Sequence, residues 1–296
     1  MLCYPINREL ILKVSMFDSV ITIESSYDLA CRIANRLKIP VLKIEATTRS
    51  NGEILVNGSL EGKNILALFP NTGNSNHDFV SFLFMIDGFQ NITAIIPYMP
   101  YSRADKSHEL RVIAKMLESR GVTSIITLDI HSTTSISAFN IPVTNINSFE
   151  IFSEIYRKED QNILIVSPDI GATQRASLFA EKLGKEIVFI DKITGILTGP
   201  QEIKGKKCII VDDIIDTGRT LNIASRIIKE KGAESIEACI THGIFSAVDI
   251  FDYPIDVFYI SESVVPINVC EKIKYLTTDE VFACNILGAP HQPMMI

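Results

Sequence analysis

Two adjacent carboxylates precede a loop of small and hydroxylated residues in KKCIIVDDIIDTGRTLNIASRIIKEKG, residues 206–232. Asp212 and Asp213 close a run of buried-type residues, and the loop DTGRT (216–220) leads from there into a helical pattern. Unpaired charge at the end of a buried strand is costly. The carboxylate pair and the loop are therefore the first candidates for chemistry in this chain.

A loop that runs from a strand straight into a helix directs backbone N–H groups and the helix N-terminus at one point, as in a phosphate cradle. Threonine hydroxyls add donors, and a glycine lets the backbone approach an oxyanion closely. Carboxylates are acceptors that suit the hydroxyls of a sugar. The pattern indicates a ribose 5-phosphate site, although an Asx turn with a helix N-cap is the alternative. Its candidate residues are Asp212, Asp213, Asp216, Thr217, Gly218, Arg219 and Thr220.

Short β-rich runs alternate with helical patterns along the chain, which predicts right-handed βαβ units and mostly parallel sheets in an α/β fold. IIVDD, ILIVSPD, IITLDIH and AIIPY are nearly continuous apolar runs, as in strands covered on both faces, so function is expected at their carboxyl ends. The predicted strands are 39–47, 53–57, 63–69, 92–98, 123–130, 141–145, 162–168, 186–191, 206–213, 235–241 and 256–262, and the predicted helices are 27–37, 78–90, 109–120, 148–158, 171–183 and 220–231.

The βα patterns before and after about residue 147 are similar, and 296 residues are enough for two domains of ordinary size. We therefore expect two similar α/β domains, 1–147 and 148–296. The second would carry the ribose-phosphate loop.

Composition excludes several classes of function. A formal net charge of -7 argues against a nucleic-acid binder, which needs clustered Lys and Arg. No apolar run reaches the ~18 residues of a membrane span. The six cysteines are scattered without a CxxC pair, which favours thiols in a reducing compartment and a cytoplasmic protein. No GxxxxGK[ST] motif occurs, and no GxGxxG follows a strand, so a Walker-type or dinucleotide site is not expected.

VDDIIDTGRT resembles the ribose-phosphate binding signature of phosphoribosyltransferase-fold proteins. Further segments follow in the order found in the ribose-phosphate diphosphokinases, also called phosphoribosyl pyrophosphate synthetases, so the chain resembles that family over nearly its whole length. These segments are RSNGEILV (49–56), FMIDGF (84–89), IIPYMPYSRADK (95–106), TLDIHS (127–132), NIPVTNI (140–146), IVSPDIGATQRA (165–176), FIDK (189–192) and CITHGIFS (239–246).

The resemblance implies two phosphoribosyltransferase-type domains, Mg²⁺, and transfer of the β,γ-diphosphate of ATP to the 1-hydroxyl of ribose 5-phosphate. It also implies a homo-oligomer, because the family's ATP site lies between subunits. By position, Asn51 and Glu53 would lie near the adenine of a neighbouring subunit's nucleotide, and His131 and Asp169 at the metal. The residues implied to hold ATP or to act as catalytic cations are Arg103, Asp105, Lys106 and Lys192.

Each of these residues also has a purely structural explanation. His131 could be a satisfied core histidine, and Asp169 could be an N-cap of helix 171–183. Arg103 and Lys106 could form a solvated ion-pair cluster with Asp105. Lys192, at the end of a strand, could be an ordinary surface lysine.

The loop after FIDK departs from the family pattern. Family members supply cations from a mobile loop in which a lysine is followed by arginines, whereas here Lys192 is followed by ITGILTG in a shorter loop without arginine. Losing one preorganised donor typically costs ~10²–10³ in rate. Active diphosphokinase, phosphoribosyltransferase and catalytically silent regulatory paralogue therefore stay open as three hypotheses.

Two other departures concern the ligands. Ala104 replaces a common glutamine, which removes a polar contact with the nucleotide, and Arg219 replaces a small residue of the phosphate loop. Arg219 could reach an anionic group beyond the 5-phosphate. A larger acceptor such as ADP-ribose is therefore a further hypothesis.

Overall fold

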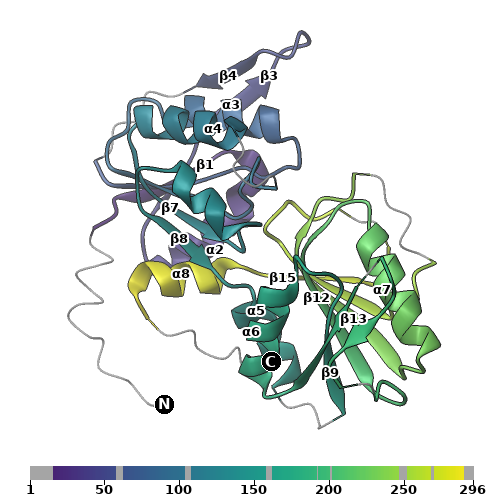
Figure 1. Ribbon diagram of the computed structural model, residues 1–296. Coiled ribbons are helices and arrows are strands. Elements are labelled where there is room, and N and C mark those ends of the chain that lie inside the picture. The colour runs from purple at the N-terminus through teal and green to yellow at the C-terminus, as the bar shows by residue number, and fades with distance from the viewer. Residues whose placement is uncertain are drawn as a thin grey trace. The chain divides into compact units, whose positions relative to one another are not determined.

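The computed structural model describes residues 16–57, 63–103, 108–157, 162–191, 193–200, 202–246, 252–267 and 270–289 (Figure 1). They form two compact units. Residues 16–146 and 278–289 belong to unit 1, and Asn147–Thr277 to unit 2. The division falls beside the expected boundary at residue 147. Residues 278–289, however, belong to unit 1, whereas all of 148–296 was predicted to form the second domain.

Unit 1 is built on a six-stranded parallel sheet in the order β2-β1-β5-β6-β7-β8. Its strands are β1 (Ser19–Thr22), β2 (Val41–Lys43), β5 (Ile65–Leu68), β6 (Ile92–Ile96), β7 (Val122–Leu128) and β8 (Val143–Ile146). Its helices are α2 (Tyr27–Leu37), α3 (Ser75–Met85), α4 (His108–Ser119) and α8 (Asp279–Leu287), with 3-10 helices at Glu24–Ser26 and Thr133–Ala138.

Helices α3 and α4 cover one face of the unit 1 sheet. Phe79 and Phe82 of α3 and Ile113 of α4 are buried against strand residues such as Ala67 and Ala94. Because the strand side chains alternate between faces, Leu66 points to the other face and is also fully buried. Burial on both faces explains the nearly continuous apolar strands of the sequence.

Unit 2 contains a seven-stranded sheet in the order β11-β10-β9-β12-β13-β14-β15, in which only β11 runs antiparallel to its neighbour. The strands are β9 (Ile163–Ser167), β10 (Glu186–Ile190), β11 (Leu197–Thr198), β12 (Lys207–Ile215), β13 (Ser235–Gly243), β14 (Val257–Ser261) and β15 (Ile273–Leu276). The helices are α5 (Phe149–Tyr156), α6 (Thr173–Leu183) and α7 (Arg219–Glu230).

The two faces of the unit 2 sheet have separate cores. Leu164 of β9 packs in one cluster with Ile228 of α7. Its neighbour Ile165 packs in the other cluster with Phe152 of α5 and Phe179 of α6. Figure 1 accordingly shows α5 and α6 on one face of the sheet and α7 on the other. This arrangement directs the end of β12 into α7, where the sequence placed the phosphate loop.

The two units share one topology. In each, the second strand lies outside the first, and four further strands follow on the other side: β2-β1-β5-β6-β7-β8 corresponds to β10-β9-β12-β13-β14-β15. An extra antiparallel piece follows the second strand in both. In unit 1 it is the hairpin of β3 (Glu45–Thr48) and β4 (Ile54–Asn57), and in unit 2 it is β11. The expected pair of similar α/β domains, each with a mostly parallel sheet, is confirmed.

Helix α8 explains why the domain boundary was only partly predicted. It packs on α2 in unit 1, as α5 packs on α6 in unit 2, and α2 and α6 occupy corresponding places. Asp279 at the start of α8 forms ion pairs with Arg32 and Arg36 of α2. These partners lie more than two hundred residues apart in the sequence, so no local pattern could reveal the contact.

Other differences are local. The predicted strand 39–47 is two strands, β2 and β3, and the predicted helix 78–90 is α3, which begins at Ser75 and ends at Met85. β1, β11 and β15 were not predicted, because two to four residues carry too little periodicity. Among the described residues, no helix combines the length and the apolar character needed to span a bilayer.

Candidate ribose-phosphate site

The loop between β12 and α7 has the geometry expected of an anion cradle. Gly218 adopts a left-handed conformation with φ of 68° and is the N-cap of α7, which begins at Arg219. The N–H of Asn222 donates to the carbonyl of Gly218 at 2.9 Å, so the first helical hydrogen bond starts directly at the loop. The N–H groups of the first turn have no partner within the helix, and Thr217 on the loop is exposed. An anion is the natural partner for these donors.

Gly218 is required at its position for two reasons. A side chain is strained at positive φ. A Cβ atom there would also lie 2.7 Å from the hydroxyl oxygen of Tyr253. The Tyr253 ring is buried, and its hydroxyl donates to the carbonyl of Thr217 at 3.4 Å. Tyr253 thus packs against the loop and stabilises it, a role that was not predicted from the sequence.

The side chain of Asp216 forms hydrogen bonds within the protein. Its carboxylate accepts hydrogen bonds from the hydroxyl of Ser246 and from the N–H of Ser246, the latter at 3.4 Å. A carboxylate cannot donate a hydrogen bond to a phosphate and repels it. The side chain of Asp216 therefore stabilises the loop through Ser246, and its predicted contact with a phosphate stays a prediction.

Asp212 and Asp213 lie within β12, which continues to Ile215, two residues beyond the predicted strand end at 213. The Asp213 side chain is buried and the Asp212 side chain is nearly so. The N–H of Asp213 donates to Oδ1 of Asp212 at 2.9 Å. Two neighbouring carboxylates of low exposure need a positive partner, and the structure supplies it from α6.

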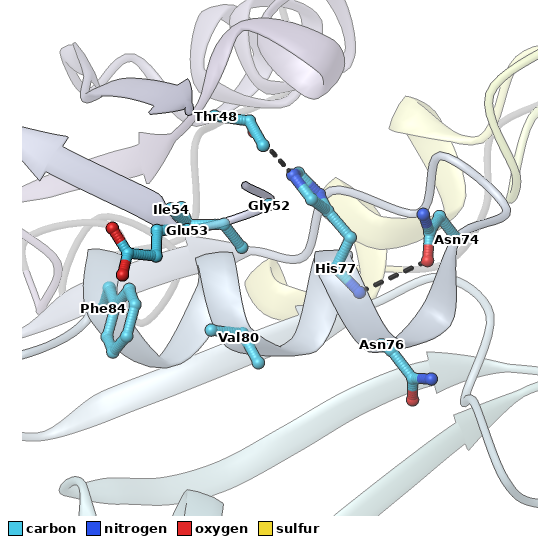
Figure 2. Close-up of a pocket in the computed structure, with 9 residues that line it drawn as sticks. All are labelled: Thr48, Gly52, Glu53, Ile54, Asn74, Asn76, His77, Val80 and Phe84. Atoms are coloured by element: carbon cyan, nitrogen blue, oxygen red, sulfur yellow. Dashed lines mark hydrogen bonds between the residues drawn. The ribbon is translucent and has the colours of Figure 1, made fainter. Parts of the chain in front are cut away.

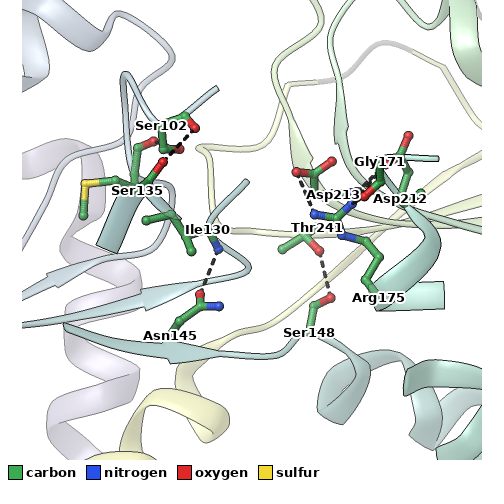
Figure 3. Close-up of polar contacts among 12 residues, drawn as sticks. Ser102, Ile130, Ser135, Asn145, Ser148, Gly171, Arg175, Asp212, Asp213 and Thr241 are labelled. Carbon is green, nitrogen blue, oxygen red and sulfur yellow. Dashed lines mark hydrogen bonds and ion pairs between the residues drawn. The ribbon is translucent and has the colours of Figure 1, made fainter. Parts of the chain in front are cut away.

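Arg175 is that partner, a residue that was not among the predicted site residues. Its Nη2 lies 3.0 Å from Oδ2 of Asp213, and its Nη1 lies 3.6 Å from Oδ1 of Asp212 (Figure 3). Nη1 also donates to the carbonyl of Gly171 at 3.3 Å, which fixes the guanidinium at the start of the helix. The requirement for a cation beside two buried carboxylates could have directed attention to this arginine in IVSPDIGATQRA.

The carboxyl of Asp212 has a raised pKa. Burial raises the pKa of Asp212 well above its usual range, repulsion from Asp213 raises it further, and Arg175 opposes both. The charge of Asp169 adds to the increase in this pKa. Keeping a buried carboxylate ionised costs free energy. Hydrogen bonds donated by the hydroxyls of a sugar would stabilise the ionised form.

Asp169 follows β9 at the same carboxyl edge of the sheet. Its Oδ1 accepts the N–H of Ala172 at 3.2 Å, and its carbonyl accepts the hydroxyl of Ser167 at 2.8 Å. The carboxylate thus partly fulfils the capping role that was the structural alternative. His131 belongs to unit 1 and is exposed, which contradicts the alternative of a buried core histidine.

The residues that face this edge fit a magnesium ion carried by a substrate. The described part of the chain contains no group of three or more His, Cys, Asp or Glu side chains that could hold a metal by itself. Mg²⁺ commonly uses one or two carboxylates together with substrate phosphates, so such a group is not required. Asp169 is the carboxylate at this edge that would hold it.

The expected nucleotide residues of unit 1 lie on the β3–β4 hairpin. Oδ1 of Asn51 accepts the N–H of Glu53 at 3.2 Å, which shapes the turn, and Glu53 forms an exposed ion pair with Arg49. Between this hairpin and α3 lies a groove of about 580 Å³ (Figure 2). It is lined by Thr48, Gly52, Glu53, Ile54, Asn74, Asn76, His77, Val80 and Phe84.

The groove has an apolar wall and polar ends. Val80 and Phe84 of α3 are exposed along it, and His77 shares a hydrogen bond of 2.9 Å with the hydroxyl of Thr48. Glu53 stands beside Phe84 in Figure 2. An apolar wall next to a carboxylate suits a flat heterocycle with amino groups.

The remaining cation predictions are only partly covered by the structure. Arg103 is exposed in unit 1. Asp105, Lys106 and Lys192 lie outside the described residues, so their predicted roles stay predictions.

The loop after β10 is a closed turn. Oδ1 of Asp191 accepts the N–H groups of Ile193 and Thr194 at 2.9 and 3.3 Å, and the N–H of Asp191 donates to the carbonyl of Ile196 at 3.0 Å. Ile193 is 90% exposed and Ile196 is 62% exposed. Residues 193–200 contain no Lys or Arg, so this part of the turn brings no positive charge to the carboxyl edge.

The chain is similar to known proteins over most of its length. Residues 19–121 match the N-terminal domain of ribose phosphate pyrophosphokinase, and residues 140–247 match the phosphoribosyl transferase domain. The chain is 32% identical to the ribose-phosphate pyrophosphokinase of Ralstonia nicotianae, over 89% of this chain and 92% of that protein. It is 33% identical to that of Thermosipho africanus, over 84% and 87%. The crystal structure of phosphoribosylpyrophosphate synthetase from Mycobacterium smegmatis is similar with a TM-score of 0.81 and 26% identity, over 90% and 97% of the two chains.

Proposed function

The chain belongs to the ribose-phosphate pyrophosphokinase family and is a diphosphotransferase enzyme, and we propose that it transfers the β,γ-diphosphate of ATP to the 1-hydroxyl of a ribose 5-phosphate moiety, releasing AMP. The observation that carries this proposal is the pairing of the 216–220 loop with Asp212 and Asp213 at one edge of the unit 2 sheet. Hydrogen-bond donors for a phosphate, in the loop, and hydrogen-bond acceptors for the two hydroxyls of a sugar, on Asp212 and Asp213, then lie at opposite ends of one short segment.

The proposed binding mode uses the local chemistry of this segment. The 5-phosphate accepts N–H groups from the start of α7 and hydroxyls from Thr217 and Thr220. The ribose hydroxyls donate to Asp212 and Asp213, whose charges Arg175 holds in place. Fixing both ends of the sugar leaves the anomeric hydroxyl as the free nucleophile, which favours transfer by positioning.

For diphosphoryl transfer the protein mainly has to align the acceptor hydroxyl and to neutralise the negative charge of the transferred group. Magnesium bound with ATP would supply part of that neutralisation. We propose Arg103 and Lys192 as further cations, with Asp105 and Lys106 beside the nucleotide. His131 and Asp169 are the proposed contacts to the metal and its phosphates.

We further propose that Asn51 and Glu53 contact the adenine of ATP held by a second copy of the chain. The exposed hairpin and the groove beside Glu53 support this proposal. Mixing two inactive variants, Glu53→Gln and Gly218→Ala, would then restore activity, because some mixed sites combine two intact halves. If each site used residues of one chain only, the mixture would stay as inactive as its components.

The acceptor could be larger than ribose 5-phosphate. Arg219 is exposed at the first position of α7, directly beside the phosphate loop, and suits an additional anionic group such as the second phosphate of ADP-ribose. Arg219→Ala would then lower activity with ADP-ribose by about tenfold, from the loss of a charge-assisted hydrogen bond, and leave ribose 5-phosphate little changed. Arg226→Ala, on the same helix but away from the loop, is the matched control.

A catalytically silent paralogue is the second candidate, and the closed turn after β10 favours it. That turn presents Ile193 and Ile196 where relatives are expected to carry cations. Such a protein would bind ribose 5-phosphate and ATP without releasing AMP. A phosphoribosyltransferase would instead turn over the diphosphate product with a nucleobase and need no ATP.

One experiment separates these candidates. The chain is incubated with Mg-ATP and either ribose 5-phosphate or ADP-ribose, and the products are identified by mass spectrometry. Release of AMP together with an acceptor heavier by one diphosphate is the expected result. Ligand binding without AMP release would reject the proposed activity.

A further inference from the structure

The segment that follows β13 lies against the ribose-phosphate loop, and we infer that Phe245 in this segment is a positioning residue for the binding of ribose 5-phosphate. Its role rests on the function proposed above, because the loop is the proposed site of the 5-phosphate. Phe245 has a left-handed backbone with φ of 51°. This conformation is strained for an aromatic residue, and residues strained in this way cluster at binding and active sites.

Hydrogen bonds to β12 hold Phe245 in this conformation. The N–H groups of Ile244 and Phe245 both donate to the carbonyl of Ile215, at 2.9 and 3.3 Å. Ile215 is the last residue of β12 and directly precedes the loop 216–220. The shared carbonyl therefore connects the backbone of Phe245 to the start of the ribose-phosphate loop.

Gly243 makes room for the ring of Phe245. A Cβ atom at Gly243 would lie 2.6 Å from Cε2 of Phe245, so a larger residue there would displace the ring. The ring is partly buried and packs against the core on the α7 face of the sheet. A simple turn at the end of β13 would need no ring, because glycine adopts the left-handed conformation without strain. Packing of the ring therefore fixes the turn in one conformation.

The left-handed backbone of Phe245 directs the next residue to the loop. The hydroxyl and the N–H of Ser246 both donate to Oδ1 of Asp216, the N–H at 3.4 Å. These two donors hold the first residue of the loop. A residue with negative φ at position 245 would send the chain in another direction and separate Ser246 from Asp216.

The loop is also held further along its length. The hydroxyl of Tyr253 donates to the carbonyl of Thr217 at 3.4 Å. Ser246 and Tyr253 both lie between β13 and β14, so one connection of the sheet supplies both contacts. A loop that is fixed before the ligand arrives loses less conformational entropy on binding, which strengthens its affinity for a phosphate.

The first test is a calorimetric titration of the full chain with ribose 5-phosphate, without ATP. Phe245→Gly removes the ring and allows a positive φ, and Ser246→Ala removes the hydroxyl that reaches Asp216. Each variant should bind about threefold to tenfold more weakly than the wild type. The double variant should bind as weakly as the weaker of the two single variants, because both changes release the same contact. A loss equal to the product of the two single losses would overturn the inference.

Lys38→Gly is the matched control for backbone strain. Lys38 ends α2 in unit 1 with φ of 56°, so glycine there removes strain of the same kind from the other unit. This variant should bind ribose 5-phosphate as the wild type does. Affinity for ATP should stay within about twofold of the wild type in Phe245→Gly and Ser246→Ala, whereas a general loss of structure would weaken both ligands.

Hydrogen exchange of the amides of residues 216–220 gives a second readout that needs no ligand. Exchange should be about tenfold faster in Phe245→Gly and in Ser246→Ala than in the wild type. Unchanged exchange in both variants would overturn the inference even if the chain proves to be an active diphosphokinase. Faster exchange in a chain that releases no AMP would support the role of Phe245 and reject only the proposed function.

Discussion

The carboxylate of Asp78 accepts two hydrogen bonds from Thr72, one from its N–H at 2.7 Å and one from its hydroxyl at 2.6 Å. Thr72 lies in the loop NTG (71–73) between β5 and α3, which corresponds in topology to the loop DTG (216–218) between β12 and α7. In unit 1 a buried side chain of the following helix thus takes the place of an anionic ligand. The donors of this unit 1 loop are therefore already used within the protein, which gives a physical reason for the proposal that the unit 2 loop binds the phosphate.

Removing the carboxylate of Asp78 should lower the stability of the protein, and a small carboxylate in solution should restore part of it. In Asp78→Ala the N–H and hydroxyl of Thr72 lose their acceptor, which should lower stability by about 2–3 kcal/mol. Free acetate or formate should restore part of that loss, because a small carboxylate can occupy the vacated volume. Thermal unfolding with increasing acetate, at constant ionic strength, measures the effect.

Asp87→Ala is the matched control for that experiment. Asp87 is exposed and pairs with Arg120 on the surface of the same unit, so its removal should be nearly neutral and insensitive to acetate. Equal responses of the two variants to acetate would show that Asp78 does not fill an anion position.

Arg175 should be essential for the carboxylate pair. Arg175→Gln leaves Asp212 and Asp213 without their cation, and breaking a pair of this burial typically costs about 3–5 kcal/mol. The loss should be larger at neutral than at acidic pH, because Arg175 lowers the pKa of Asp212 and its absence favours protonation. Ribose 5-phosphate affinity should fall at least tenfold. Arg226→Gln controls for charge removal on the same unit, and a similar loss in that variant would contradict the assignment.

Local patterns predicted much of the fold. The runs that became β9, β12 and β13 were found because central parallel strands are apolar along their whole length. Gly121, Gly184 and Gly232, placed after predicted helices, all have positive φ as helix ends require. The loop 216–220 was selected as a candidate because a glycine and hydroxyl residues stand between a strand and a helix, and its proposed phosphate contact stays a prediction.

Long-range partners could not be predicted in the same way. The contact of Arg175 with Asp213 joins residues on different elements, and Tyr253 reaches Gly218 from a segment without any motif. Helix α8 is buried on most sides and shows no clear amphipathic period, so no local pattern could place it in unit 1. One of these partners had a signal in the sequence: two buried carboxylates, Asp212 and Asp213, require a nearby cation, which predicts a partner such as Arg175.

The ionised carboxylate of Asp212 should lower the stability of the folded state and strengthen the binding of ribose 5-phosphate. Because its pKa is raised above the usual carboxyl range, the folded state holds a proton that the unfolded state has already released. Stability from this group is therefore present at low pH and is lost as pH rises from the unfolded pKa through the raised pKa. Asp212→Asn cannot show this loss, and its Oδ1 can still accept the N–H of Asp213.

The expected result for Asp212→Asn is a melting temperature equal to the wild type near pH 4 and higher by a few degrees near pH 8, which corresponds to roughly 1 kcal/mol. Ribose 5-phosphate affinity should fall about tenfold with the loss of a charged acceptor. Thermal unfolding across this pH range and a binding titration at pH 8 measure the two effects. A variant less stable than the wild type at pH 8 would contradict the raised pKa.

Gly218 provides a test of the loop that uses a glycine from the same unit as its control. Both Gly218 and Gly205 have positive φ, 68° and 74°, so Ala at either position carries a similar backbone penalty of about 1 kcal/mol. At Gly205 nothing lies within 4 Å of the added Cβ atom, whereas at Gly218 the Tyr253 hydroxyl lies at 2.7 Å. The difference between the two variants therefore isolates the displacement of the loop.

We expect Gly205→Ala to lose about 1 kcal/mol of stability and to keep its affinity for ribose 5-phosphate. Gly218→Ala should lose more stability, and its affinity should fall tenfold or more, because the N–H groups of the loop no longer converge on the phosphate. Replacing Tyr253 with Leu in the Gly218→Ala background should recover part of that affinity by making room for the Cβ atom. Unchanged affinity in Gly218→Ala would show that the 5-phosphate does not bind at this loop.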